Sequence, residues 1–164
     1  MAAFPVRACR PGVSSGPPML SAEMLKILTE HHASNPKIGN IFSRISRGPG
    51  SKDLEALLNT IIEKNPSRDA QGNAAYTLAT IKMRSKDQQA EAEKLLEKII
   101  AEYKDVKYFS STLGARAEGS LFEVRNLQIG KVVPDIEGED MDGKKFKLSD
   151  YRGKVVMLDF WGHW

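Results

Sequence analysis

The sequence of 164 residues predicts an α+β chain, mostly α-helical in its N-terminal part, with a β-hairpin and one buried strand in its C-terminal part. Two stripes of apolar residues at three- and four-residue spacing, in residues 54–62 and 92–103, predict amphipathic helices. A partly β-branched apolar run at residues 155–160 predicts the strand. The composition, 41% hydrophobic and 27% charged, is typical of a globular protein.

Charge and cysteine content narrow the class of function. The net charge of +3 is small and evenly spread, so nucleic acid is not predicted as a partner. Cys9 is the only cysteine, which excludes an internal disulfide and a cysteine-rich zinc site, and we expect no metal and no cofactor. No apolar run approaches the ~18 residues of a membrane span. No signal peptide is predicted either, because no apolar core follows the early arginines.

Residues 1–20 are predicted to be a disordered tail. They hold four of the chain's eight prolines together with glycine and serine, a composition that cannot build a packed core. Cys9 lies in this tail. A lipid anchor would need an apolar stretch before the cysteine, so Cys9 is interpreted as an incidental exposed thiol rather than a reactive or lipid-modified one.

Residues 21–128 are predicted to form an α-helical domain whose helices are bounded by capping serines and by Asn-Pro or Gly-Pro pairs. The helix over residues 54–62 takes Ser51 or Asp53 as its cap. Gly114 and Gly119 lower the helix propensity of the last segment by up to about 1 kcal/mol each, so that helix needs tertiary support. The predicted helices cover residues 21–34, 38–46, 54–62, 70–84, 87–103 and 111 or 112–126.

Residues 70–84 and 87–103 are expected to form a helical hairpin. Their sequences, Ala-Ala-Tyr-x-Leu-Ala and Ala-Glu-x-Leu-Leu-Glu-x-Ile-Ile-x-x-Tyr, resemble one tetratricopeptide-like unit. A repeat array would imply a protein partner on the helical domain. Because one unit is seen and repeat folds need about three, an ordinary bundle is the preferred interpretation.

Residues 129–164 combine turn and strand signals. Phe146 and Leu148 alternate with lysines after Asp142-Gly143, a dipeptide that tolerates the positive φ angles of a hairpin turn. Ser149 and Asp150 provide cap-type oxygens for a short helical turn that ends at Gly153. The strand at residues 155–160 follows.

The order of these parts resembles the start of a thioredoxin-like domain. It runs Gly-Lys-x-x-Pro-Asp, an Asp-Gly turn, Leu-Ser-Asp-Tyr-Arg-Gly-Lys, and a strand ending Asp-Phe-Trp. More narrowly it resembles the redoxin branch, which includes thiol-disulfide reductases of the TlpA and ResA type and AhpC/TSA peroxidases. In that family the Phe-Trp-x-x-Trp seen at residues 160–164 is followed at once by Cys-Gly-Pro-Cys. The resemblance therefore implies a thioredoxin-like domain truncated just before its redox motif, in a chain that is itself inactive.

The resemblance also implies roles for three residues. Asp159 matches the buried acid that accepts a proton from the resolving cysteine; the alternative is a carboxylate exposed at a strand end. Trp161 and Trp164 would flank the redox centre, although Trp161 could equally be a core residue. His163 lies at a variable position and is interpreted as a surface residue.

Three functions remain open at this point. The preferred one is a redoxin fragment whose parent exchanges electrons with protein or small-molecule disulfides and thiols. The second is an AhpC/TSA-type thiol peroxidase, and the third is a helical protein-binding adaptor with an inactive redoxin stub. The compartment is not predicted, although the parent family is often extracytoplasmic. We expect the helices to fold and residues 129–164 to be loosely held and prone to association.

Overall fold

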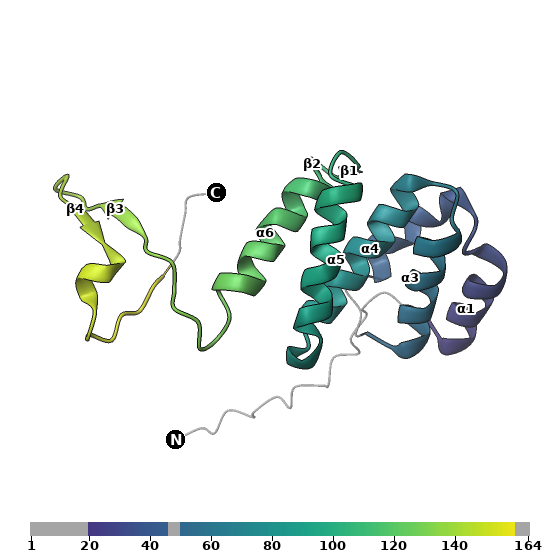
Figure 1. Cartoon of the computed structure of the whole chain (residues 1–164), viewed down its shortest axis with the longest axis horizontal. Helices are drawn as coiled ribbons and strands as arrows, with labels where there is room; N and C mark the ends of the chain where they lie inside the picture. Colours follow the sequence, from purple (N-terminus) through teal and green to yellow (C-terminus); the bar gives the residue numbers. More distant parts are fainter. Residues whose placement is uncertain (1–19, 46–49, 160–164) are drawn as a thin grey trace, which may run out of the picture. The chain divides into compact units, whose positions relative to one another are not determined.

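The computed structural model describes residues 20–45 and 50–159, and the structural statements below concern those residues (Figure 1). The chain divides into two compact units, one reaching Leu121 and one starting at Phe122. The predicted disordered tail, apart from Leu20, lies outside the described part, as do Trp161, His163 and Trp164.

The first unit begins with short helical segments. The Oγ atom of Ser21 accepts a hydrogen bond from the amide of Met24 at 3.2 Å, which confirms the predicted cap. The second predicted helix, residues 38–46, is present as a 3₁₀ segment followed by a single α-turn. The segments are α1 (Ala22–Ile27), the π-helix η1 (Leu28–His32), the 3₁₀-helix η2 (Pro36–Ile41) and α2 (Phe42–Ile45).

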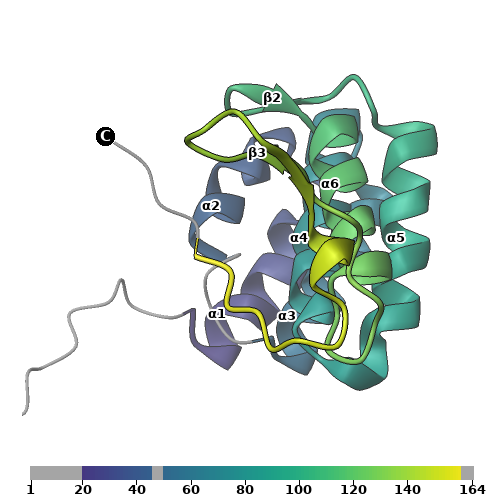
Figure 2. The same ribbon diagram turned by 90° about the vertical axis from the view of Figure 1, so that its left-hand side faces the viewer.

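Three longer helices follow and lie side by side, with α4 between α3 and α5 (Figures 1 and 2). Ser51 and Ser67 cap α3 and α4 through their Oγ atoms, which accept from the amides of Leu54 and Ala70. The helical hairpin predicted for residues 70–103 is confirmed as α4 and α5. The segments are α3 (Lys52–Lys64), α4 (Arg68–Met83), the 3₁₀-helix η3 (Lys86–Gln88) and α5 (Gln89–Glu102).

The apolar stripes predicted from sequence form the core of this unit. Each large aliphatic side chain that is fully buried contributes about 1.5–3 kcal/mol relative to leaving it in water. Buried alanines on α4 provide a small-residue surface against which the neighbouring helices pack. The largest buried apolar side chains are Leu57, Leu58, Ile61, Leu78, Leu96, Ile99 and Leu113.

Three polar residues of the described chain are buried in this unit, Asn65, Thr77 and Lys82, and each side chain has a hydrogen-bond partner. The hydroxyl of Thr77 donates to the carbonyl of Asn73 at 2.8 Å. The Nδ2 atom of Asn65 donates to the carbonyl oxygens of Ala33 at 2.6 Å and Asn35 at 3.0 Å. The ammonium of Lys82 bridges Glu91 at 2.6 Å and Glu55 at 3.4 Å, and its hydrogen bond to Glu91 raises the pKa of Lys82. Asn65 and Lys82 therefore tie together segments that are distant in sequence.

A two-stranded hairpin leads into the last helix and was not predicted. Strand β1 (Lys107–Tyr108) pairs antiparallel with β2 (Ser111–Thr112), and the connecting residue Phe109 has a φ of +52°. Helix α6 (Leu113–Asn126) follows and confirms the predicted last helix.

The second unit contains the predicted β-hairpin. Strand β3 (Glu137–Glu139) pairs antiparallel with β4 (Lys145–Lys147), and the 3₁₀-helix η4 (Leu148–Tyr151) follows. Gly143 has a φ of +78° in the connecting turn, as the Asp-Gly signal predicted. The chain thus combines a helical N-terminal part with short strands near its C-terminus, which confirms the α+β class.

The buried strand predicted at residues 155–160 is not formed in the described part of the chain. Val155–Asp159 belong to no helix or strand, and all five residues are exposed. The physical reason is that a strand needs a partner for its backbone hydrogen bonds, and β3 and β4 pair only with each other among the described residues. The apolar run identifies a segment suited to burial, which nothing in this part of the chain covers.

Candidate functional site

The second unit is built around a contact between its first and last turns. The carboxylate of Asp135 accepts two hydrogen bonds from Ser149, one from the amide at 2.8 Å and one from the hydroxyl at 2.7 Å. These bonds, led by that from the hydroxyl, lower the pKa of Asp135, so the group stays ionised. The contact joins the segment entering β3 to the helical turn after β4.

Strand β4 continues this connection. The amide of Leu148 donates to the carbonyl of Ile136 at 2.9 Å, which extends the β3–β4 pairing by one bond. The ammonium of Lys147 pairs with Glu137 on the facing strand, and this bond raises the pKa of Lys147. The amide of Lys147 also donates to the carboxylate of Asp150 at 2.9 Å. Side chains on both strands therefore hold the start of η4 in place.

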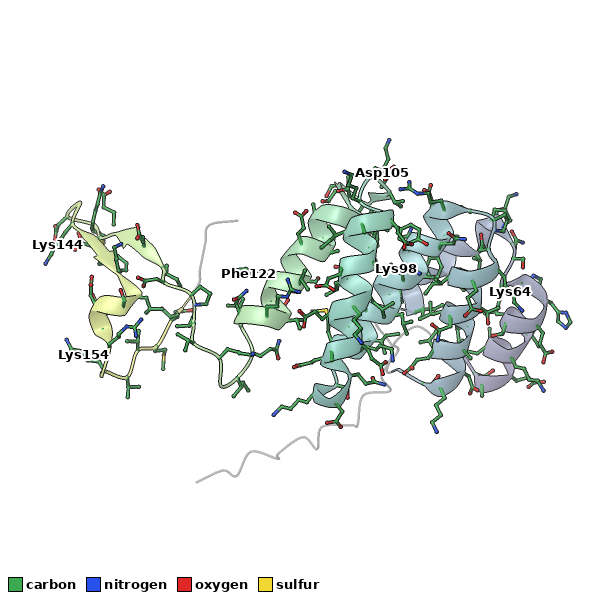
Figure 3. All side chains as sticks on the ribbon, in the orientation of Figure 1. Lys64, Lys98, Asp105, Phe122, Lys144 and Lys154 are labelled. Carbon is green, nitrogen blue, oxygen red and sulfur yellow. The ribbon has the colours of Figure 1, made fainter. Side chains whose placement is uncertain are left out.

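The far end of the hairpin, where Figure 3 labels Lys144, is closed by hydrogen bonds to Asp140. Its Oδ1 atom accepts from the amides of Asp142 at 3.0 Å and Lys144 at 2.8 Å, as Asx turns do. On the face of the hairpin, Phe146 lies over Gly138, where an added Cβ atom would come within 2.9 Å of the ring. Any other residue at position 138 would therefore require the ring of Phe146 to shift.

Beyond η4 the chain turns at Gly153, whose φ is +82°, and enters an exposed apolar segment. Val155 and Met157 are essentially fully exposed, at 104% and 92% of their reference areas. Asp159, the predicted proton acceptor, is exposed at the end of this segment. The structure thus places Asp159 but does not bring it together with Trp161 and Trp164, which lie outside the described residues.

Sequence reasoning missed the bond between Asp135 and Ser149. It interpreted the oxygen of Ser149 as a helix cap, whereas that hydroxyl donates to Asp135 and Asp150 makes the bond back to the start of η4. The available signal was the Pro-Asp pair before the hairpin and the Ser-Asp pair after it. Neither pair specifies a contact across 14 residues without the hairpin register.

Within residues 20–45 and 50–159, no group of three or more histidine, cysteine or carboxylate side chains is placed to hold a metal ion. No helix among these residues has the length and apolar character needed to cross a membrane.

Comparison with known proteins gives a partial but consistent match. Residues 129–164 match the AhpC/TSA family. The thiol-disulfide oxidoreductase ResA of Bacillus thuringiensis strain Al Hakam is 43% identical over 47 residues, which cover 29% of this chain and 27% of that protein. ResA of Geobacillus kaustophilus is 50% identical over 38 residues, or 23% of this chain and 22% of that protein.

The Bacillus subtilis ResA protein is 44% identical over 39 residues, covering 24% of this chain and 22% of its own length. The chain therefore spans about a quarter of the length of the curated relatives it matches. No solved structure matches the chain.

Proposed function

We propose that this chain is part of a thiol-disulfide oxidoreductase, because residues 129–164 match the AhpC/TSA family and resemble the start of ResA proteins. The observation that carries the proposal is the family match over the segment that ends Phe-Trp-Gly-His-Trp, the approach to a Cys-x-x-Cys motif. The active protein then carries its redox cysteines directly after Trp164, and the helical unit precedes the redox domain.

The proposed chemistry is exchange between a dithiol and a disulfide. A thiolate attacks one sulfur of a substrate disulfide and forms a mixed disulfide, releasing the other substrate sulfur as a thiolate. The second cysteine then attacks the mixed disulfide, so that the enzyme is oxidised and the substrate is reduced by two electrons. Cys9 is remote in sequence from the motif and is given no part in this reaction.

In this proposal Asp159 accepts the proton of the second cysteine. Burial disfavours the charged form of a carboxylate and so favours uptake of a proton, and the role therefore requires Asp159 to become buried. The exposed apolar residues that precede it, Val155 to Leu158, are the ones whose burial in a complete sheet would bring the carboxylate out of water. Asp159 can therefore act as the proton acceptor only in a protein in which the segment Val155 to Leu158 is covered.

The test is reduction of insulin disulfides by dithiothreitol, followed by turbidity. Two proteins are compared: this chain, and the chain extended along the reading frame of its source gene. Activity in the extended protein alone supports the proposal. Inactivity of both proteins, with an extension that lacks cysteine, contradicts it and favours a helical adaptor with an inactive redoxin stub.

The role of Asp159 needs its own variant in the extended protein. Asp159→Asn removes the proton acceptor with little change in volume, so we expect a lower rate and a changed pH profile of the resolving step. Asp142→Asn, in the exposed hairpin turn, is the matched control and should leave the rate and the pH profile unchanged. An unchanged profile in Asp159→Asn would reject the proton-transfer role while leaving the exchange reaction intact.

A second candidate function rests on the family match itself. The AhpC/TSA family includes thiol peroxidases, whose thiolate attacks the peroxide oxygen to give a sulfenic acid and release water. The same extended protein should then consume hydrogen peroxide in the presence of dithiothreitol. Peroxide consumption without insulin reduction would favour the peroxidase, and the reverse result would favour the reductase.

A further inference from the structure

A cluster of aromatic rings lies on the first unit, and none of its residues has a part in the redox proposal. Tyr76 on α4 packs edge-on against Tyr108 on β1 with ring centroids 5.1 Å apart. Phe109 packs edge-on against Tyr108 at 4.9 Å. The guanidinium carbon of Arg116 on α6 lies 6.0 Å from the centre of the Tyr108 ring. These four residues are called the aromatic surface below.

The aromatic surface borders a shallow hollow of about 300 Å³, which Thr77 and Thr80 also line. The hydroxyl groups of both threonines donate to carbonyl oxygens of α4, at 2.8 and 2.9 Å. The hydroxyl of Tyr76 lies 3.3 Å from that of Ser120. Because the fold already uses these hydroxyl groups, the rings and the guanidinium of Arg116 are the features left for a ligand.

Phe109 is the most unusual residue of this surface. Its φ of +52° is one that side chains with a Cβ atom rarely adopt, and glycine or asparagine would adopt it at lower cost. Phe109 is also 77% exposed, so burial against the described part of its own unit does not offset the strain. A residue that is strained and exposed at once is explained if its ring becomes covered by something outside the unit.

We propose that the aromatic surface docks a segment of a partner protein in which a carboxylate lies next to an aromatic or large apolar side chain. The carboxylate pairs with Arg116, the one charged side chain lining this hollow in the described part of the chain. The apolar side chain packs on Phe109 and Tyr108. Tyrosine and arginine are enriched among the residues that dominate binding energy at protein interfaces, and a guanidinium binds a carboxylate through two parallel hydrogen bonds.

Two other occupants fit less well. A second copy of the chain docked about a twofold axis centred on this surface would bring Arg116 against Arg116, and like charges at an interface are unfavourable. A small molecule would gain little shelter, because the volume is at the lower end of ligand pockets and the Phe109 ring protrudes into solvent. A peptide segment can cover a protruding ring and reach the guanidinium together.

The test selects peptides from a library of random displayed heptapeptides on the full chain. The most enriched peptide is then synthesised with a fluorescein label, and its dissociation constant is measured by fluorescence anisotropy. We expect the enriched peptides to pair aspartate or glutamate with an aromatic or large apolar residue. Arg116→Gln should weaken binding about tenfold or more, equivalent to about 1.4 kcal/mol. Lys64→Gln, on an exposed lysine at the end of α3, is the charge-matched control and should not change it.

The Phe109→Gly variant distinguishes an effect on peptide binding from an effect on the stability of the fold. Glycine relieves the strain at a φ of +52°, so the melting temperature should stay the same or rise while peptide binding weakens about tenfold or more. The proposal is overturned if no peptide is enriched, or if the enriched peptides bind the Arg116→Gln and Phe109→Gly proteins as tightly as the parent. The proposal is also overturned if no peptide binds and a fluorescein-labelled oligothymidine does. A dimer in sedimentation that the Phe109→Gly substitution dissociates would overturn it as well.

Discussion

The guanidinium of Arg68, in the first turn of α4, holds the carboxylate of Asp105 through two hydrogen bonds of 2.8 and 2.6 Å. The same guanidinium donates to the carbonyl of Glu102 at 2.6 Å, at the end of α5. It also lies 5.9 Å from the ring centre of Tyr103. Asp105 follows α5, at one end of the helical unit (Figure 3). The pair thus joins the start of one helix to the end of the next.

This pair predicts a pH dependence of stability. The hydrogen bonds from Arg68 lower the pKa of Asp105 to about 2, below the value of about 3.9 expected in an unfolded chain. The contribution of the pair is therefore fully present above about pH 4 and is lost as the pH falls towards 2. Asp105→Asn should lower the melting temperature slightly at pH 7 and flatten its decrease between pH 4 and 2. An unchanged pH dependence would show that the pair contributes nothing, as for many exposed ion pairs.

Substitution by alanine should have opposite effects on stability at two glycines, Gly72 and Gly119. A Cβ atom on Gly72 would lie 2.8 Å from Leu113 Cδ1 and 3.1 Å from Tyr103 Cδ1, so Gly72→Ala should destabilise the protein by about 1–3 kcal/mol. A Cβ atom on Gly119 meets nothing within 4 Å, so Gly119→Ala should stabilise it by about 0.5–1 kcal/mol through helix propensity. Urea unfolding of both variants measures the difference. Equal stabilisation by both would mean that α4, α5 and α6 are not closely packed at Gly72.

Removing the buried side-chain amide of Asn65 should lower the free energy of unfolding by more than the size of this side chain suggests. Asn65→Ala removes the donor for the carbonyl oxygens of Ala33 and Asn35, and the acceptor for the amide of Ser67. Leaving such groups unpaired should cost about 1–3 kcal/mol of unfolding free energy. Asn59→Ala, at an exposed position of α3, is the matched control and should change stability by no more than about 0.5 kcal/mol. A loss no greater than in that control would mean that water replaces the missing bonds.

The exposed apolar segment predicts fast amide exchange. Val155–Asp159 form no ladder and are exposed, so their amides should exchange near the rate of an unstructured peptide. The amides of residues 95–100, within α5, should be strongly protected. The same exposure should make the isolated chain associate at high concentration, which sedimentation velocity measures. Protection of Val155–Asp159 equal to that of α5 would contradict the prediction.

The sequence predicted those parts of the fold that depend on neighbouring residues. Helix caps such as Ser21 and Ser51, the apolar stripes of α3 and α5, and the turn at Gly143 all act within about one turn of chain. The β1–β2 hairpin was missed because its turn contains no glycine, asparagine or proline, and Phe109 adopts the positive φ instead. A local pattern cannot indicate a residue that the remaining structure forces into an unfavourable conformation.

The candidate site was harder to predict because its contacts join residues that are distant in sequence. Asp159 could be named through a family resemblance, but its burial depends on residues that would have to cover Val155 to Leu158. The Asp135–Ser149 contact depends on the register of a hairpin between them. The aromatic surface was missed because it joins α4, β1 and α6, and no spacing in the sequence places Tyr76 beside Tyr108.

The contact between Asp135 and Ser149 has a consequence for the order in which the protein forms. It spans 14 residues, and the β3–β4 pairing inside it spans fewer. Short loops close in microseconds or less, whereas a ribosome adds roughly 5–20 residues per second. The hairpin can therefore be complete as soon as Ser149 leaves the ribosomal tunnel. The apolar segment that emerges next therefore does so after the β3–β4 hairpin has had time to form.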